Sequence, residues 1–511
     1  MEKDMRLPGR ICALYVVLVT GPYLLTFPPS GYGAIASWKF FWYVAPTTAF
    51  CAAILIWLAR KRRLNELVFW KSPSRLERLT MGAMLAYLLF TALSGARSPF
   101  DGTFFGYMRY DGVLTVMLYV LSAFLLARYF EPKRWMAWVF AAAVVLTCLL
   151  GVAQLLGDNP FGLYPAGYNY YDAGVYWSGV FWGTVGNADL CGAVLSLSAG
   201  LFLALLARGR PKDMPVYAAA LVCCSFSIME LNIESALAAL ALGMLLLPAF
   251  IAVDPETLSR LLRAYGIAAF GGALGLTVRF YRGGAELLPR RSGIALFALA
   301  VVLPLGCRLL LKTRGPRTLD GRGLRRALAV LAVAALSAAL LAVYCIDGLP
   351  VTALAQAHEI LHGNLDDRFG SGRIYIWKQV WQLIRERPLF GGGPDTLSLR
   401  GMEGFSRYSE ELDMMIVNGV DAAHNEYLNI WVNQGGLALA AYLAVLAASA
   451  VRWWKAGGDD ITAVSGAAVL FYAIQAFFSI SFCAVTVFLW IALATLNRSN
   501  ITVMLQMSGS T

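Results

Sequence analysis

The segment 421–436 concentrates polar groups that could do chemistry directly before a strongly apolar run. Ten of its residues, 424–433, include one His, one Glu and three Asn, and the apolar run 437–451 follows. Polar groups at the entrance of a membrane span are costly unless they are paired or used. An imidazole with a pKa near neutrality is suited to accept a proton from an attacking hydroxyl group. We therefore predict a site around His424 that faces one side of a membrane.

Residues 371–373 read Ser-Gly-Arg and begin a segment whose apolar residues recur at helical spacing, at positions 374, 377, 380, 381 and 384. This pattern predicts an amphipathic helix along the membrane surface, ended by Pro388 and followed by a tight Gly-Gly-Gly-Pro-Asp turn at 391–395. Arg373 would then lie at the height of phosphate groups, which a guanidinium binds by two-point contact. It binds either an ordinary phospholipid or the phosphate of a lipid-linked substrate.

The segment 358–362 reads His-Glu-Ile-Leu-His, the HExxH pattern in which two histidines of one helix face bind zinc beside a glutamate base. The candidate helix is short because Gly363 ends it, and a third ligand would have to come from Asp366, Asp367 or farther away. We therefore predict no metal site and interpret the segment as a surface helix with two histidines. A zinc metalloprotease is the alternative that this motif leaves open.

The composition indicates the class of protein in which these groups act. Of 511 residues, 59% are hydrophobic and only 14% are charged. A soluble protein carries about 25% charged residues and cannot bury so much apolar surface in one core. The apolar residues form runs of roughly 17–25, which is enough to cross a bilayer. We predict an all-α, multi-pass membrane protein whose net charge of +11 reflects basic cytoplasmic loops and requires no nucleic acid.

The apolar runs predict about 12–14 transmembrane helices in three parts. Residues 1–346 form a membrane bundle of about eleven spans, 347–435 form a long extracytoplasmic loop with the amphipathic helix and the His424 motif, and 436–511 form the last spans and a short cytoplasmic tail. The basic connections fall on one side, which places both termini in the cytoplasm. Arg279 and Arg282 break this pattern, because the predicted number of spans places them on the extracytoplasmic side. They either contact phosphate oxygens of a substrate or are solvated among lipid headgroups.

Two shorter outer loops contribute further candidates. The loop 94–111 ends in Arg109-Tyr110-Asp111, and the loop 157–186 is rich in Tyr, Trp and Gly. Aromatic rings stack on sugars, and they also populate the headgroup belt of membrane proteins, so both explanations stay open. Asn187 follows this loop and opens a span as a helix N-cap. We include Asn187 and Arg109 among the candidates for substrate binding.

The motifs together resemble the O-antigen ligase and polymerase superfamily. The resemblance is carried by Ser371-Gly372-Arg373 with Trp377, by the segment 387–396, and by Ala423-His424-Asn425-Glu426-Tyr427-Leu428 with Gly435-Gly436. It implies that a large outer loop bears an essential His and an essential Arg, which His424 and Arg373 match by position. Asp421 and Glu426 are candidates to orient the imidazole, and Asn425 lies beside them. Many members carry a second Arg near the start of the eighth span, where this chain reads Asn-Ile-Glu-Ser-Ala at 232–236. A second phosphate-binding arginine would then come from Arg109 or from the pair Arg279 and Arg282.

The resemblance also implies an activity. It indicates a glycosyltransferase of the bacterial cytoplasmic membrane that moves a glycan from a polyprenyl-diphosphate carrier to an acceptor, with inversion and without a metal or other cofactor. The acceptor is a glycan, a lipid, a wall polymer or a protein, and both ligases and polymerases share these motifs. The alternative is a polysaccharide exporter without transferase chemistry, which also needs many spans and a polar cavity. Related halves or helices broken at mid-membrane would favour the exporter.

The orientation can be tested by cysteine labelling at position 404. Because residues 347–435 are expected outside, a Gly404→Cys variant should react in intact cells with a maleimide that does not cross membranes. The chain without the added cysteine is the control for labelling of its nine native cysteines. Labelling that occurs only after the membrane is opened would reverse the orientation.

Overall fold

The computed structural model describes residues 2–67, 74–164, 182–283, 298, 302, 321–349, 351–409 and 414–498. Within this part of the chain, ten helices are long and apolar enough to cross a membrane. Two shorter apolar helices, α4 (Val113–Tyr129) and α17 (Cys483–Leu496), accompany them. The all-α, multi-pass membrane fold predicted from composition is therefore confirmed. The expected tenth span, 292–311, lies outside the described residues apart from 298 and 302, and the middle of the aromatic loop, 165–181, lies outside them entirely.

The other helices of the bundle are α1 (Glu2–Leu18), α2 (Ile35–Arg60), α3 (Arg75–Arg97), α5 (Arg134–Leu155), α6 (Ala188–Arg208), α7 (Met214–Leu231), α8 (Glu234–Ile251), α9 (Pro255–Gly283), α11 (Gly321–Cys345), α15 (Gly436–Ala456) and α16 (Asp460–Gln475). Several of them begin at a residue whose side chain accepts a backbone N–H, as helix caps do. Asn187 accepts from the N–H of Leu190 at 3.1 Å and so starts α6. Asn232 takes the left-handed conformation and separates α7 from α8, as the tight connection required.

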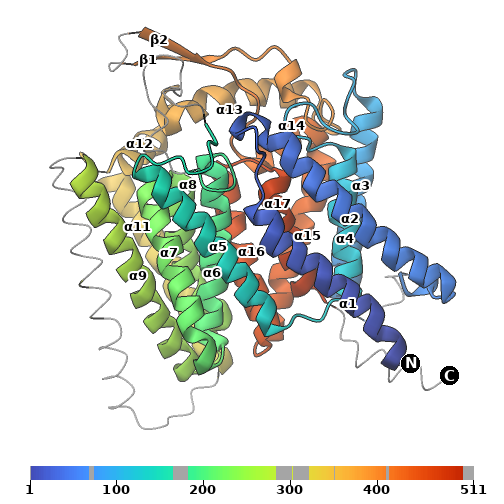
Figure 1. Ribbon diagram of the computed structural model, residues 1–511. Coiled ribbons are helices and arrows are strands. Elements are labelled where there is room, and N and C mark those ends of the chain that lie inside the picture. The colour runs from blue at the N-terminus through green and yellow to red at the C-terminus, as the bar shows by residue number, and fades with distance from the viewer. Residues whose placement is uncertain are drawn as a thin grey trace.

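Small residues let the central helices approach closely. A Cβ atom on Gly200 of α6 would lie 2.7 Å from the carbonyl oxygen of Ala467, and one on Gly243 of α8 would lie 2.6 Å from the ring of Phe471. Both α6 and α8 therefore pack against α16, with the Phe471 ring between them. On α9, Gly271 and Gly275 meet backbone carbonyls of α7 in the same way. Figure 1 shows α9 at the edge of the bundle, away from α14.

The long loop forms a cap on one end of the bundle (Figure 1). It contains α12 (Thr352–Leu361), α13 (Phe369–Glu386), the antiparallel strands β1 (Phe405–Ser409) and β2 (Met414–Asn418), and α14 (Glu426–Gln434). The apolar face of α13 and the facing side of α14 form a second core, separate from that of the bundle, with Val380, Ile384 and Val432 fully buried. This is the amphipathic helix expected from the spacing of its apolar residues. The hairpin was not predicted.

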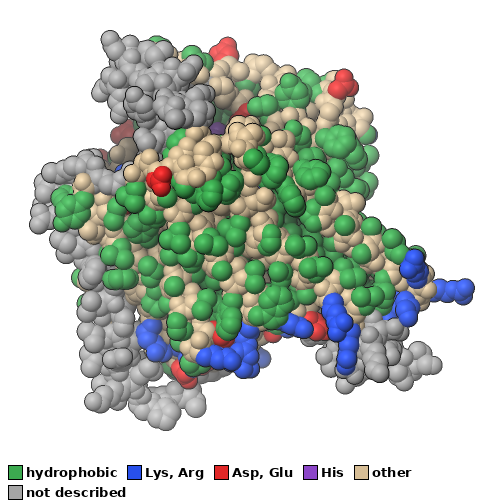
Figure 2. All heavy atoms as spheres, viewed as in Figure 1, with side chains coloured by type: hydrophobic (Ala, Val, Ile, Leu, Met, Phe, Trp, Pro, Cys, Tyr) green, Lys and Arg blue, Asp and Glu red, His purple; other side chains and the backbone are tan. Residues whose placement is uncertain are grey.

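Basic side chains mark the opposite end of the molecule. In Figure 2, Lys and Arg side chains gather along the end that lies away from α13 and the hairpin, below a broad hydrophobic belt. This end carries Arg208 at the end of α6 and Arg134 at the start of α5. The arrangement matches the alternation of basic loops in the sequence.

The loop between α13 and the hairpin is fastened to the junction of α14 and α15. The backbone N–H of Gly393 donates to the carbonyl of Asn433 at 2.7 Å, and that of Gly436 donates to the carbonyl of Pro388 at 2.8 Å. Gly435 has φ of +94°, and a Cβ there would overlap the carbonyl oxygen of Leu389. A residue with a side chain at 435 is therefore excluded both by conformation and by space.

Gly435→Ala should lower the unfolding temperature of the detergent-purified protein and reduce its activity. The substitution combines an unfavourable φ with a backbone overlap, which together cost on the order of 2 kcal/mol or more. Gly419→Ala is the matched control, because nothing lies within 4 Å of a Cβ at that position and its φ is not positive. Equal unfolding temperatures for the two variants would show that the loop is not fastened in this way.

Candidate functional site

The turn that carries His424 is held by its neighbours on both sides. The indole Nε1–H of Trp377, on α13, donates to the carbonyl of Ala423 at 2.9 Å, and the N–H of Ala423 donates to Oδ1 of Asn429 at 3.2 Å. Asn425 accepts the N–H of Leu428 at 3.0 Å and so caps α14. His424 itself has φ of +47°, which is uncommon outside glycine. The half-buried imidazole is therefore placed by a turn with little freedom to rearrange.

Arg373 lies beyond a left-handed turn at the start of α13. Gly370, Ser371 and Gly372 all have positive φ, which changes the direction of the chain before the regular helix begins. Its Nη1 donates to Oε2 of Glu234 at 3.3 Å, between α13 and the first turn of α8. Its Nη2 donates to the carbonyl of Phe478, between α16 and α17, at 3.4 Å. The side chain is only 12% exposed, so the structure holds this cation against the membrane bundle.

Arg109 reaches the same region from the loop between α3 and α4. Its Nη2 lies 2.6 Å from Oδ2 of Asp421, and the two side chains are 19% and 31% exposed. Asp395, from the Gly-Gly-Gly-Pro-Asp turn, accepts the backbone N–H groups of Met108 at 3.1 Å and of Arg109 at 2.9 Å. Burial raises the pKa of Asp395, and these hydrogen bonds and the charge of Arg109 oppose that rise. The turn predicted from its glycines therefore positions Arg109.

The charges of four residues act on His424. Burial is the main cause that lowers its pKa from the ordinary value, and the positive charges of Arg109 and Arg373 lower it further. The carboxylates of Asp189 and Asp421 oppose them. The imidazole is consequently neutral at pH 7, with acidic groups nearby that would stabilise it once a proton arrives.

Both arginines keep an unused donor beside His424. The Nε–H groups of Arg109 and Arg373 are buried, and neither has a hydrogen-bond partner among the described residues. Buried polar groups are normally satisfied, so two such donors near one histidine call for an acceptor from outside the described residues, and a bound substrate would supply one. Oxygen atoms of a phosphate group are the acceptors that a guanidinium binds best.

Unusual backbone conformations concentrate in the same loops. Among the described residues, six other than glycine have positive φ, and four of these are Tyr110, Ser371, Asp395 and His424. Each such conformation costs of the order of 1–3 kcal/mol and persists only where the surrounding contacts enforce it. The three segments that carry Arg109, Arg373 and His424 thus share strained turns that regular helices lack.

Besides Asn425, which caps α14, two more of the expected site residues have side chains that support the helices. Glu426 points into the bundle, where Tyr442 and Tyr472 donate to its oxygens at 2.6 Å and 2.8 Å, and burial raises its pKa to about 7. Asn187 caps α6 and lies two residues before Asp189. Neither side chain has a hydrogen bond to His424. Their place in the chain is close to the site, while their side chains support the helices around it.

The second pair of arginines lies apart from His424. Arg279 is near the end of α9, which packs against α7 and α6 at the edge of the bundle. No hydrogen bond or ion pair joins it to Arg109, Arg373 or His424. The side chain of Arg282 lies outside the described residues. Arg109 is therefore the second cation that the structure brings to the histidine.

The histidines of the HExxH segment contact backbone and aromatic groups. Nδ1 of His358 lies 2.8 Å from the carbonyl of Val343, and its Nε2 lies 3.0 Å from Asp347. The ring of His362 stacks on Tyr344 with centroids 4.4 Å apart. Within the described ranges, no three His, Cys, Asp or Glu side chains come together as a metal site would require.

Sequence reasoning missed three acidic residues of this region: Asp189, Glu234 and Asp395. Asp189 follows the expected cap Asn187 by two residues. Its position in the first turn of α6 could therefore have been predicted from the sequence. Glu234 stands where an arginine was sought, and the structure pairs it with Arg373 instead. The sequence places Asp395 in a turn and in the segment that carries the resemblance, but it does not indicate the contact with Arg109, which lies 286 residues away.

The region 284–443 of the chain matches the family model Wzy_C, O-antigen ligase. This region is therefore similar to an O-antigen ligase domain. The match confirms the resemblance to the O-antigen ligase and polymerase superfamily, and it supports a membrane protein that ligates or polymerises glycans. The domain includes Arg373, Asp395, Asp421 and His424, whereas Arg109 lies outside it. No curated protein matches the chain.

The role of Asp395 in the candidate site can be tested by two substitutions. Asp395→Ala removes the acceptor for the N–H groups of Met108 and Arg109, so glycan transfer by the folded protein should fall by about tenfold or more. Asp395→Asn keeps an oxygen acceptor and should lose less. Transfer rates of the purified variants provide the measurement. Equal losses in both would indicate that the charge of Asp395 matters rather than its hydrogen bonds.

Proposed function

We propose that the chain transfers a glycan from a polyprenyl-diphosphate carrier to an acceptor hydroxyl at the extracytoplasmic face of a bacterial cytoplasmic membrane. The observation that carries this proposal is the convergence of Arg109 and Arg373 on His424, each arginine with an unused buried donor. The match of residues 284–443 to the O-antigen ligase family model supports the general activity. The polyprenyl-diphosphate carrier, the independence of a metal and the inversion are what the resemblance to the superfamily implies, and the two arginines are compatible with a diphosphate leaving group.

In the proposed reaction, the acceptor oxygen attacks the anomeric carbon while the bond from that carbon to the diphosphate oxygen breaks. The diphosphate leaves with the bonding electron pair and gains negative charge. Arg373 and Arg109 stabilise that charge, as preorganised guanidinium groups do in a transition state. A single displacement of this kind inverts the anomeric centre. The two arginines supply positive charge at the place where other enzymes use a metal ion.

His424 accepts the proton that the acceptor hydroxyl loses. Its lowered pKa keeps the imidazole neutral and ready to act as a base at pH 7. As the proton arrives, Asp189 and Asp421 stabilise the imidazolium. Asp421 also pairs with Arg109 at 2.6 Å, so one carboxylate connects the base to the cation that holds the leaving group. In this scheme the three side chains work in one transition state.

The experiment is glycan transfer by purified, folded variants supplied with a lipid-diphosphate-linked glycan. His424→Ala and Arg373→Ala should each lower turnover by on the order of a hundredfold or more, because each removes a group that acts in the transition state. The turnover of the double variant should be little lower than that of the less active single variant, because the effects of residues that act as a unit are not additive. Arg373→Lys should rescue only in part, because an ammonium group lacks the planar two-point contact.

His362→Ala is the matched control, because it removes a histidine that stacks on Tyr344 at the edge of the cap. It should retain activity, and added EDTA should have no effect. Full activity in His424→Ala would refute the proposed base. Inhibition by EDTA together with loss of activity in His362→Ala would favour the metalloprotease motif. Glycan transport across liposomes without any transfer product would favour the exporter.

A further inference from the structure

A cavity of about 410 Å³ lies among six helices, α7 included, at the end of the molecule opposite to His424. Most of its wall is apolar and comes from α1, α5, α6, α16 and α17, with Val16, Phe140, Leu201 and Phe488 among the lining side chains. Its volume falls in the range of about 300–1,000 Å³ that is typical of small-molecule sites. The walls belong to helices that cross the membrane. An occupant of the cavity must therefore carry an apolar chain.

The mouth of the cavity is formed by the ends of these helices and is basic. Four basic side chains line it: Lys133, Arg134, Arg208 and Arg210. Two of them are paired, since Arg134 lies 3.3 Å from Asp213 and Arg208 lies 2.8 Å from Asp460. Lys133 and Arg210 are exposed, and neither has an ion-pair partner among the residues that the structure describes. The mouth thus carries two positive charges that no ion pair within the described part of the chain neutralises.

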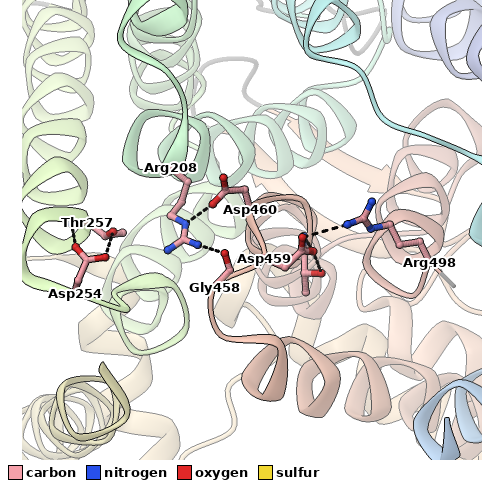
Figure 3. Close-up of polar contacts among 8 residues, drawn as sticks. Arg208, Asp254, Thr257, Gly458, Asp459, Asp460 and Arg498 are labelled. Atoms are coloured by element: carbon pink, nitrogen blue, oxygen red, sulfur yellow. Dashed lines mark hydrogen bonds and ion pairs between the residues drawn. The ribbon is translucent and has the colours of Figure 1, made fainter. Parts of the chain in front are cut away.

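Polar contacts join the helix ends at this mouth. Figure 3 shows Arg208, at the end of α6, directed to the carboxylate of Asp460 and to the carbonyl of Gly458 at the start of α16. Beside it, Asp459 caps α16 and pairs with Arg498 at 3.1 Å. The side chain of Arg208 is only 7% exposed. The two helices that frame the apolar wall are therefore fixed relative to each other at the membrane boundary.

We propose that this cavity binds one phospholipid with an anionic headgroup from the leaflet at the basic end of the bundle. An acyl chain occupies the apolar space, and the phosphate lies between Lys133 and Arg210. Basic pockets between transmembrane helices on this side of a membrane bind anionic headgroups for the same reason. A zwitterionic lipid offers the same acyl chain without net negative charge, so the headgroup is the feature that the site selects. This inference does not depend on the proposed transferase reaction.

The test uses the full-length protein, stripped of lipid in detergent and titrated with phosphatidylglycerol or with phosphatidylcholine of the same acyl chains. Native mass spectrometry counts the bound lipids, and the unfolding temperature reports their effect. One phosphatidylglycerol should remain bound under conditions that remove phosphatidylcholine. The double variant Lys133→Gln/Arg210→Gln should weaken phosphatidylglycerol binding by roughly tenfold or more, because two charges near the headgroup are lost.

The matched control is Arg263→Gln/Lys455→Gln, which removes two exposed basic side chains at the same end of the bundle that do not line the cavity. It should bind phosphatidylglycerol like the unmodified chain. Ala137→Trp places a large side chain into the cavity and should abolish retention while leaving the mouth charges intact. If that variant does not fold, the two charge variants decide the question. Equal retention of both lipids, or equal losses in the two charge variants, would overturn the proposal.

Discussion

The ion pair between Arg109 and Asp421 joins segments 312 residues apart, and the candidate site depends on it. One partner comes from the loop before α4 and the other from the end of the long cap, so neither part of the chain forms the site alone. The same carboxylate raises the proton affinity of His424, while the same guanidinium lowers it. Folding the cap onto the bundle therefore assembles the candidate site and places the charges that shift the pKa of His424 in one step.

Burial of these charges at the membrane boundary carries a cost that the surrounding structure offsets. The second core between α13 and α14 supports the cap, and backbone contacts of Gly393 and Gly436 fasten it to the α14–α15 junction. The strained turns at Ser371 and His424 persist because these contacts leave the loops no freedom to relax. Preorganisation of this kind matters for electrostatic stabilisation, since groups that are already placed need no rearrangement during the reaction.

Apolar runs predicted most of the bundle because the length of a span is set by the bilayer and not by tertiary contacts. The helical spacing of 374–384 likewise predicted α13. The candidate site was harder to predict from the sequence. Residue spacing indicated His424 and Arg373 as two separate candidates, and only the family resemblance indicated that they belong to one site. Arg109 and Arg279 were equal candidates, because a sequence gives the depth of a residue in the membrane but not its position within the bundle. Asp189 was missed, and the hairpin was missed because Phe405–Ser409 shows little apolar alternation.

The central claim is that two arginines and two carboxylates tune one neutral histidine, and the pKa of His424 measures this directly. The chain has three histidines, so NMR resonances of labelled imidazole rings can be assigned with His358 and His362 variants. The account predicts a pKa for His424 below the ordinary 6.5, a rise in Arg373→Gln, and a further fall in Asp189→Asn. A pKa at the ordinary value that neither substitution moves would contradict it.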